Sequence, residues 1–218
     1  MKTIEERLLE GRQYRDIDLG TFEHRSEDDG RLIVRGYATT FNQPYTLWND
    51  GNYTVVEQVD ALAFDGADMS DVIMQYDHAG RVFARNTNRT LGLTLDERGL
   101  AVEAELSGTA LGRQLYEEIA GGYTTKMSFG FTVAEDRRDV TEDHDTGKVT
   151  VLRTITRIRK LYDVSAVSIP ANPATSISAR TYGEGVIAEI LEELHAREQR
   201  EAQRRKIKIM LEATYGRH

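Results

Sequence analysis

An alternating hairpin in the middle of the chain constrains the fold more than any other feature. Residues 90–95 and 100–106 both alternate apolar with small or polar side chains, and the segment Asp96-Glu97-Arg98-Gly99 lies between them. A period of two is typical of half-buried strands, and a short polar segment that ends in glycine is typical of the turn between them. We therefore predict an antiparallel hairpin here, within a mainly β core.

Other segments rich in β-branched and aromatic residues predict further strands. These segments are residues 32–41, 53–59, 72–76, 124–133, 149–158 and 161–169. The polar stretch 135–148 contains a turn signal at residues 143–147 and predicts a loop.

One amphipathic helix is expected after the hairpin. Leu111, Leu115 and Ile119 recur every four residues and so share one helical face. Ser107 or Thr109 can cap the first turn of this helix, and a glycine pair follows its last turn.

The C-terminal part has a different pattern. Apolar residues at 186, 187, 190, 191 and 194 form a stripe at helical spacing, and Gly183 and Gly185 before them predict a hinge. From His195 onward, seven basic and three acidic residues make this end positive. A solvated helix and a helix that docks on a partner or on its own barrel both fit this pattern.

Together these elements predict a mainly β fold with helices (α+β). We expect a closed antiparallel β-barrel of about seven strands, with one mid-chain helix and a C-terminal helix. The chain then divides into a polar acidic N-terminal arm (residues 1–30), a barrel domain (31–182) and a charged C-terminal helix (183–218). The arm carries five Lys/Arg and nine Asp/Glu, and we expect it to be a short helical or extended segment.

Composition excludes several classes of function. The chain of 218 residues has 28 basic and 36 acidic side chains and a net charge of −8, which disfavours nucleic acids and anionic membranes as partners. It has no cysteine, so it has no disulfide, thiolate zinc site or cysteine nucleophile. No run approaches roughly 18 apolar residues, and the acidic first residues lack the apolar core of a secretion signal. We expect a soluble intracellular protein.

Three residues are candidates for catalysis. Ser128 is a lone hydroxyl in the apolar strand segment TTKMSFGF, and in the simplest interpretation it satisfies a nearby backbone group. As a nucleophile it would need a base, and His78 is the one of five histidines that ends an apolar strand. Asp163 interrupts the strand 161–167, where a buried carboxylate needs a partner such as a histidine N–H. Only a closed or strongly curved sheet would bring these three strands together.

Five motifs occur in order along the chain. They are GYATTF (36–41), YDHAG (76–80), TLGLTLDERGLAVEAEL (90–106), KMSFGF (126–131) and LYDVSAVSIPANPAT (161–175). From about residue 30 to 180, the chain resembles the prohead proteases of tailed bacteriophages of the HK97 type. The combination of KMSFGF with DVSAVSIPANP is specific, whereas any one motif alone would not be.

The resemblance implies a serine endopeptidase with Ser128 as nucleophile, His78 as general base and Asp163 as the acid that orients the imidazole. Many relatives have glutamate at the last position, so the aspartate is a departure from the family pattern. The family is also similar in fold to herpesvirus assembly proteases, in which a second histidine replaces the acid. His144, in a hydrophilic turn, is a poor candidate for that role.

The resemblance also implies partners and a location. Such enzymes act inside the phage prohead in the bacterial host cytoplasm, where they remove the scaffolding portion of the major capsid protein and then cut their own chain. The arm before residue 30 and the tail after Gly183 are the expected cut regions, because their sequences predict flexible segments that are separable from the barrel domain. We expect no cofactor and no metal, and a homo-oligomer is compatible with this function.

Two other classes of function are open from the residues alone. A noncatalytic capsid assembly or scaffold protein would explain the acidic barrel and the charged tail without any triad. A metal-dependent hydrolase would need clustered ligands, but the histidines are scattered and no HExxH pattern occurs.

Overall fold

The computed structural model describes residues 4–17, 22–143, 145–167 and 173–215. The chain divides into two compact units, Met1–Arg180 and Thr181–His218. In chain order, the elements are α1 (Ile4–Leu9), β1 (Gln13–Ile17), β2 (Glu23–Ser26), β3 (Leu32–Thr40), β4 (Tyr45–Asn49), β5 (Tyr53–Val59), β6 (Ile73–Tyr76), β7 (Ala79–Arg85), a 3-10 turn (Asn86–Asn88), β8 (Leu91–Leu95), β9 (Gly99–Glu105), α2 (Ala110–Ala120), β10 (Lys126–Asp143), β11 (Lys148–Val167) and α3 (Pro173–Tyr215).

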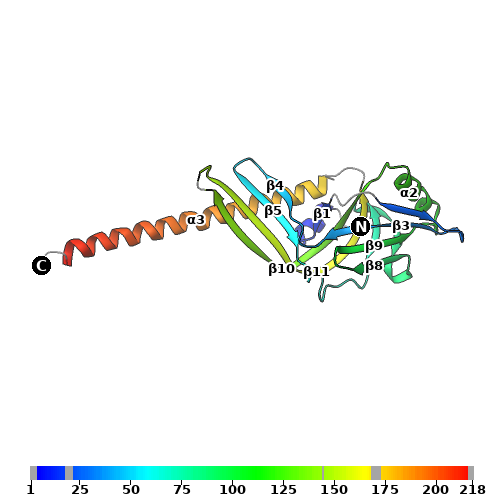
Figure 1. Cartoon of the computed structure of the whole chain (residues 1–218), viewed down its shortest axis with the longest axis horizontal. Coiled ribbons are helices and arrows are strands. Elements are labelled where there is room, and N and C mark those ends of the chain that lie inside the picture. Colours follow the sequence, from blue (N-terminus) through cyan, green and yellow to red (C-terminus); the bar gives the residue numbers. More distant parts are fainter. Residues whose placement is uncertain (1–3, 18–21, 144, 168–172, 216–218) are drawn as a thin grey trace. The chain divides into compact units, whose positions relative to one another are not determined.

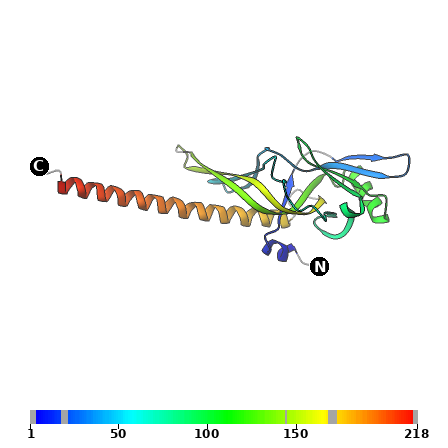
Figure 2. The same ribbon diagram turned by 90° about the horizontal axis from the view of Figure 1, so that it is seen from below.

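The strands form two sheets (Figure 1). The larger sheet has the order β1-β10-β11-β5-β4, with β6 and β7 attached beside β11, and the smaller sheet has the order β2-β3-β9-β8. Strand β11 joins the parts of the larger sheet, because it pairs antiparallel with β10, parallel with β5 at residues 149–155 and parallel with β6 at residues 163–166. Figure 2 shows β10 and β11 as a long twisted ribbon.

The predicted closed antiparallel barrel is wrong, although the mainly β fold with few helices is confirmed. Neither sheet closes on itself, and β11 runs parallel to both β5 and β6. Alternation along a strand does not predict which distant strand it pairs with, or whether the two run parallel. Strands β5 and β11 are far apart in the sequence: Gln58 of β5 donates a hydrogen bond to Thr154 of β11, 96 residues further along. The two sheets instead share one apolar core, to which Val34 and Val102 contribute from the smaller sheet and Phe129 from the larger.

The predicted hairpin and mid-chain helix are confirmed. Strands β8 and β9 form the hairpin, and the Asp96 carboxylate accepts the backbone N–H groups of Arg98 and Gly99 in its turn. Helix α2 begins after Thr109, whose hydroxyl accepts the N–H of Gly112 at 2.9 Å. Capping of this kind satisfies one of the N–H groups that the first helical turn leaves unpaired.

The predicted loop over residues 135–148 is wrong. Strand β10 continues to Asp143 and β11 starts at Lys148, so only a short turn separates them. The two predicted strands that follow the loop form one continuous strand, β11. Side chains at residues 137–143 are exposed and, apart from Val140, polar, as expected for a ribbon whose backbone groups pair across the two strands. Polarity alone therefore did not distinguish a solvated strand from a loop.

The C-terminal helix is present as α3, and it begins before the predicted boundary. It runs continuously from Pro173 through Gly183 and Gly185, where a hinge was expected. A glycine inside a helix costs only about 1 kcal/mol relative to alanine, so a long helix tolerates it. Of the helices that the structure describes, none combines the length and apolar content needed to cross a membrane.

The acidic arm contributes to the first unit through α1, β1 and β2. Strand β1 pairs antiparallel with β10, and its Arg15 is fully buried. Arg15 donates from Nε to Glu57 Oε1 at 2.5 Å and from Nη2 to Glu57 Oε2 at 3.0 Å. Arg153 of β11 and Tyr45 of β4 also donate to this carboxylate, each at 2.5 Å. We call Arg15, Glu57, Arg153 and Tyr45 the buried ion cluster.

The cluster changes the acidity of Glu57. Burial is the largest single effect and raises the pKa of this carboxyl, but the charges of Arg15 and Arg153 and the hydrogen bonds of Arg15 and Tyr45 together outweigh it and lower the pKa from the usual 4.5 to about 2. Because the pKa is lower in the folded chain, the stabilisation is complete above about pH 4.5 and is lost as the pH falls toward 2.

Acidification should therefore destabilise the protein through Glu57. The pKa difference corresponds to roughly 3 kcal/mol of unfolding free energy in total, of which about 2 kcal/mol is lost by pH 3. Urea denaturation at pH 7 and pH 3 measures this loss, and Glu57→Gln should lose about 2 kcal/mol less than the wild type between these two values. Glu135→Gln, in the exposed pair with Arg157, is the control and should lose as much as the wild type. Equal losses in all three proteins would contradict the role of Glu57.

Candidate active site

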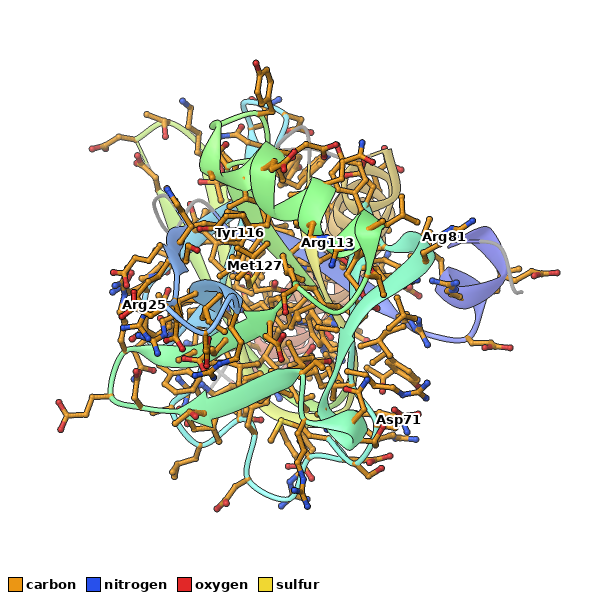
Figure 3. All side chains as sticks on the ribbon, turned by 90° about the vertical axis from the view of Figure 1, so that its right-hand side faces the viewer. Arg25, Asp71, Arg81, Arg113, Tyr116 and Met127 are labelled. Carbon is orange, nitrogen blue, oxygen red and sulfur yellow. The ribbon has the colours of Figure 1, made fainter. Side chains whose placement is uncertain are left out.

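Ser128 lies in the first, buried part of β10, between β1 and β11. Its α-carbon is opposite Ser165 of β11 on one side and Asp16 of β1 on the other. Neighbouring residues of a strand face opposite sides of the sheet, and Met127 before it belongs to the apolar core (Figure 3). The hydroxyl of Ser128 therefore points to the face of the larger sheet opposite to this core.

His78 lies in the two-residue turn between β6 and β7. Asp77 and His78 have φ angles of 48° and 55°, and Tyr76 pairs with Ala79 around them. Left-handed backbone at both central positions is the geometry of a tight hairpin turn that usually requires Asn or Gly. Strain at a residue of this size is typical of functional sites, where the surrounding structure holds it in place. Here the Asp77 N–H donates to the Ala166 carbonyl of β11 at 3.0 Å and fixes the turn.

The structure brings the three predicted residues together. His78 Nε2 lies 2.5 Å from Ser128 Oγ, and His78 Nδ1 lies 2.5 Å from Asp163 Oδ1. The side chains of all three are buried. Burial is the largest single effect and raises the pKa of Asp163, but the charge and hydrogen bond of His78, together with Arg12 and Ser165, outweigh it, so the carboxyl is more acidic than usual.

Two further side chains contact the Asp163 carboxylate. Ser165, two residues along β11, donates its hydroxyl to Oδ1 at 3.1 Å. Arg12 Nη1 lies 3.8 Å from Oδ2, and its guanidinium lies 3.6 Å from the ring centroid of Tyr162. Among the residues that the structure describes, no group donates a hydrogen bond to Oδ2, so Arg12 is the nearest compensation for its charge.

Gly130 makes room for this carboxylate. It is opposite Asp163 in the β10–β11 register. A β-carbon at Gly130 would lie 2.3 Å from Asp163 Oδ2 and 2.9 Å from Tyr14 Cε1, which is closer than real β-carbons approach. A side chain at this position would therefore displace either the acid or the tyrosine.

The N-terminal arm supplies contacts that the sequence did not predict. The ring of Tyr14 lies 4.4 Å from the ring of His78, centroid to centroid, at an angle of 54°. Arg7 of α1 donates from Nη1 to the backbone carbonyl of His78 at 2.9 Å. The only local signal was the strand-like character of Gln13–Ile17 within an otherwise polar arm, and it does not show which strand β1 would join.

None of the other histidines in the described residues joins this site. His144, the alternative third residue, lies outside the described residues. His24 contacts the ring of Tyr116 of α2, and His195 is exposed on α3. Within the described parts of the chain, no three His, Asp or Glu side chains lie close enough to hold a metal ion.

Geometry and sequence indicate the same class of protein. A hydroxyl, an imidazole and a carboxylate joined in this order form the arrangement used by serine hydrolases. A sequence model of the caudovirus prohead serine proteases, Peptidase S78, matches residues 20–186, and the chain belongs to this family. The resemblance to the prohead proteases is confirmed.

A solved structure is also similar to this chain. The capsid assembly protease gp21 of bacteriophage T4 is similar over 72% of this chain and 96% of its own, with 11% sequence identity and a TM-score of 0.40. A comparison with curated proteins finds no match.

Gly130→Ala should lower peptidase activity by about 10²-fold, because a displacement of about 1 Å at a reacting group has an effect of this size. Gly92→Ala is the matched control: Gly92 also lies within a strand, but a β-carbon there would be 3.7 Å from its nearest neighbours. Both variants are compared by circular dichroism and by their rate of substrate cleavage. Wild-type activity in Gly130→Ala would contradict the steric argument.

Proposed function

We propose that this protein is a serine endopeptidase that removes the scaffolding portion of the major capsid protein during prohead maturation and also cuts its own chain. Family membership supports a prohead serine protease. The observation that carries the catalytic assignment is the pair of 2.5 Å contacts that joins Ser128, His78 and Asp163.

In the proposed reaction, Ser128 Oγ attacks the carbonyl carbon of the scissile peptide bond while His78 Nε2 takes the hydroxyl proton. The tetrahedral intermediate collapses, the C–N bond breaks, and His78 gives the proton to the leaving amine. Water then hydrolyses the acyl-enzyme by the same proton transfers in reverse order.

Asp163 has an orienting role in this mechanism. Its contact with His78 Nδ1 favours the tautomer that carries a proton on Nδ1, so that the lone pair of Nε2 faces Ser128. Its negative charge also stabilises the imidazolium that forms when His78 takes the proton. A lowered pKa keeps the carboxyl ionised for this role at neutral pH.

The proposal extends to the organisation of the chain. Residues 31–182 would form the peptidase domain, and the flanking segments 1–30 and 183–218 would contain the self-cleavage sites. The family match runs from residue 20 to residue 186, so its end supports a boundary near the start of the C-terminal segment, whereas its start lies within the N-terminal segment. The enzyme would cleave its substrate inside the prohead, within the bacterial host cytoplasm. It could act there as a homo-oligomer.

Substitution of the candidate triad tests this function. Ser128→Ala and His78→Ala should each lower cleavage of co-expressed capsid protein by about four to six orders of magnitude, and Asp163→Asn by about 10⁴-fold. His144→Ala is the control for the alternative third residue and should cleave normally. Gel electrophoresis of the capsid protein and of the enzyme itself gives the extent of both reactions. Normal capsid processing by Ser128→Ala would leave a noncatalytic assembly role as the better explanation.

Chelation tests the metal-dependent alternative separately. Addition of EDTA to the purified enzyme should leave the cleavage rate unchanged, because the proposed mechanism requires no metal ion. A loss of activity that zinc or magnesium restores would contradict the serine mechanism.

A further inference from the structure

The candidate active site is closed to solvent. Ser128 and His78 have 0% of their surface exposed, and Asp163 has 1%. A peptide bond must come within about 3 to 3.5 Å of the nucleophile before it can react. Some part of the protein must therefore move before a substrate reaches Ser128.

Three side chains of one segment, residues 7–17, lie against the site. Tyr14 packs its ring on the His78 ring, Arg7 binds the His78 carbonyl, and Arg12 lies beside the Asp163 carboxylate. This segment is separate from the elements that carry the three candidate residues. Its removal would leave the β6–β11 and β10–β11 pairings intact, because neither involves the segment.

The same segment occupies one backbone edge of the strand that carries Ser128. Strand β11 covers one edge of β10, and β1 covers the other edge at residues 127–131. An extended peptide can add to a sheet only at an edge whose N–H and C=O groups are unpaired. With β1 in place, this edge of β10 is filled where it passes Ser128.

Arg15 anchors the segment through Glu57. Gln13 adds a second bond, because its Oε1 accepts from Arg153 Nη1 at 2.9 Å. Arg15 makes two hydrogen bonds to Glu57, and Glu57 keeps Arg153 and Tyr45 as partners if Arg15 leaves. In contrast, the Tyr14 hydroxyl is buried without a hydrogen-bond partner among the described residues. A buried unpaired hydroxyl opposes docking, so the segment combines a specific anchor with a contact that favours release.

We propose that residues 7–17 occupy the edge of β10 on which a substrate peptide binds, and that this segment must leave the edge before the enzyme can cleave. This inference rests on the proposed function. The segment lies outside residues 20–186, which the family model matches, so the proposed closure is an addition to the part of the chain that defines the family.

Labelling of Ser128 by a fluorophosphonate reagent tests the closure in the full chain. Arg15→Met removes the anchor and should increase the labelling rate at least tenfold over the wild type. Arg157→Met, which breaks an exposed ion pair with Glu135, is the matched control and should label at the wild-type rate. Ser128→Ala should not be labelled.

A reversible lock covers the case in which Arg15→Met fails to fold. The chain has no cysteine, and the backbone of Ile17 lies opposite that of Met127 in the β1–β10 register, so oxidation of a double Ile17→Cys, Met127→Cys variant should crosslink β1 to β10. The oxidised variant should resist both labelling and cleavage of capsid protein, and reduction by dithiothreitol should restore them. Met127→Cys alone is the control and should not respond to reductant.

A synthetic peptide of residues 4–17 tests the binding edge itself. It should slow the labelling of Arg15→Met at least twofold, whereas the same peptide with Arg15→Glu should not. Equal effects of the two peptides would overturn the assignment of the β10 edge.

The outcomes separate the two proposals. Equal labelling of oxidised and reduced lock variants, with no label on Ser128→Ala, would overturn the closure and leave Ser128 as the nucleophile. Absence of label from every variant in both redox states would overturn the nucleophile assignment and the closure together.

Discussion

The pairing of β10 with β11 is the interaction on which the rest of the structure depends. It places Ser128 opposite Ser165 and Gly130 opposite Asp163, so the hydroxyl and the carboxylate share one face of the sheet. Strand β6 pairs with the same stretch of β11. The turn that follows β6 places His78 between the Ser128 hydroxyl and the Asp163 carboxylate. Backbone register thus assembles three groups from distant parts of the chain.

Several local features around this site lower the stability of the folded chain. Asp77 and His78 adopt left-handed backbone, and the buried Asp163 carboxylate has one oxygen without a hydrogen bond from the described residues. Each feature destabilises the folded chain, and the apolar core shared by the two sheets offsets these costs. Residues that destabilise the fold and yet adopt one defined geometry are typical of a functional site, whereas residues that only fill the core are not under this constraint.

Local sequence patterns predicted the local structure, but they did not predict contacts between residues that are far apart in the sequence. Alternation predicted β8 and β9, and one of the two candidate caps, Thr109, begins α2, because these features depend on neighbouring residues. Residue chemistry alone left Ser128 ambiguous, and the family resemblance supplied its partners. The space at Gly130 and the contact of Tyr14 with His78 depend on which strands become neighbours, and no local periodicity encodes this. The closed barrel failed for the same reason, since the parallel partners of β11 lie far away in the sequence.

Irregularities in the β10–β11 ladder separate its two halves. Register shifts occur at four places between Gly130 and Asp136, after the stretch that holds Ser128 and before the exposed ribbon. Such bulges absorb an extra residue without passing the offset along the strand. Insertions or deletions in the exposed residues 137–143 of β10 therefore leave the site side chains on their own face of the sheet. The facing part of β11 has less freedom, because it pairs with β5 and carries Arg153 of the buried ion cluster.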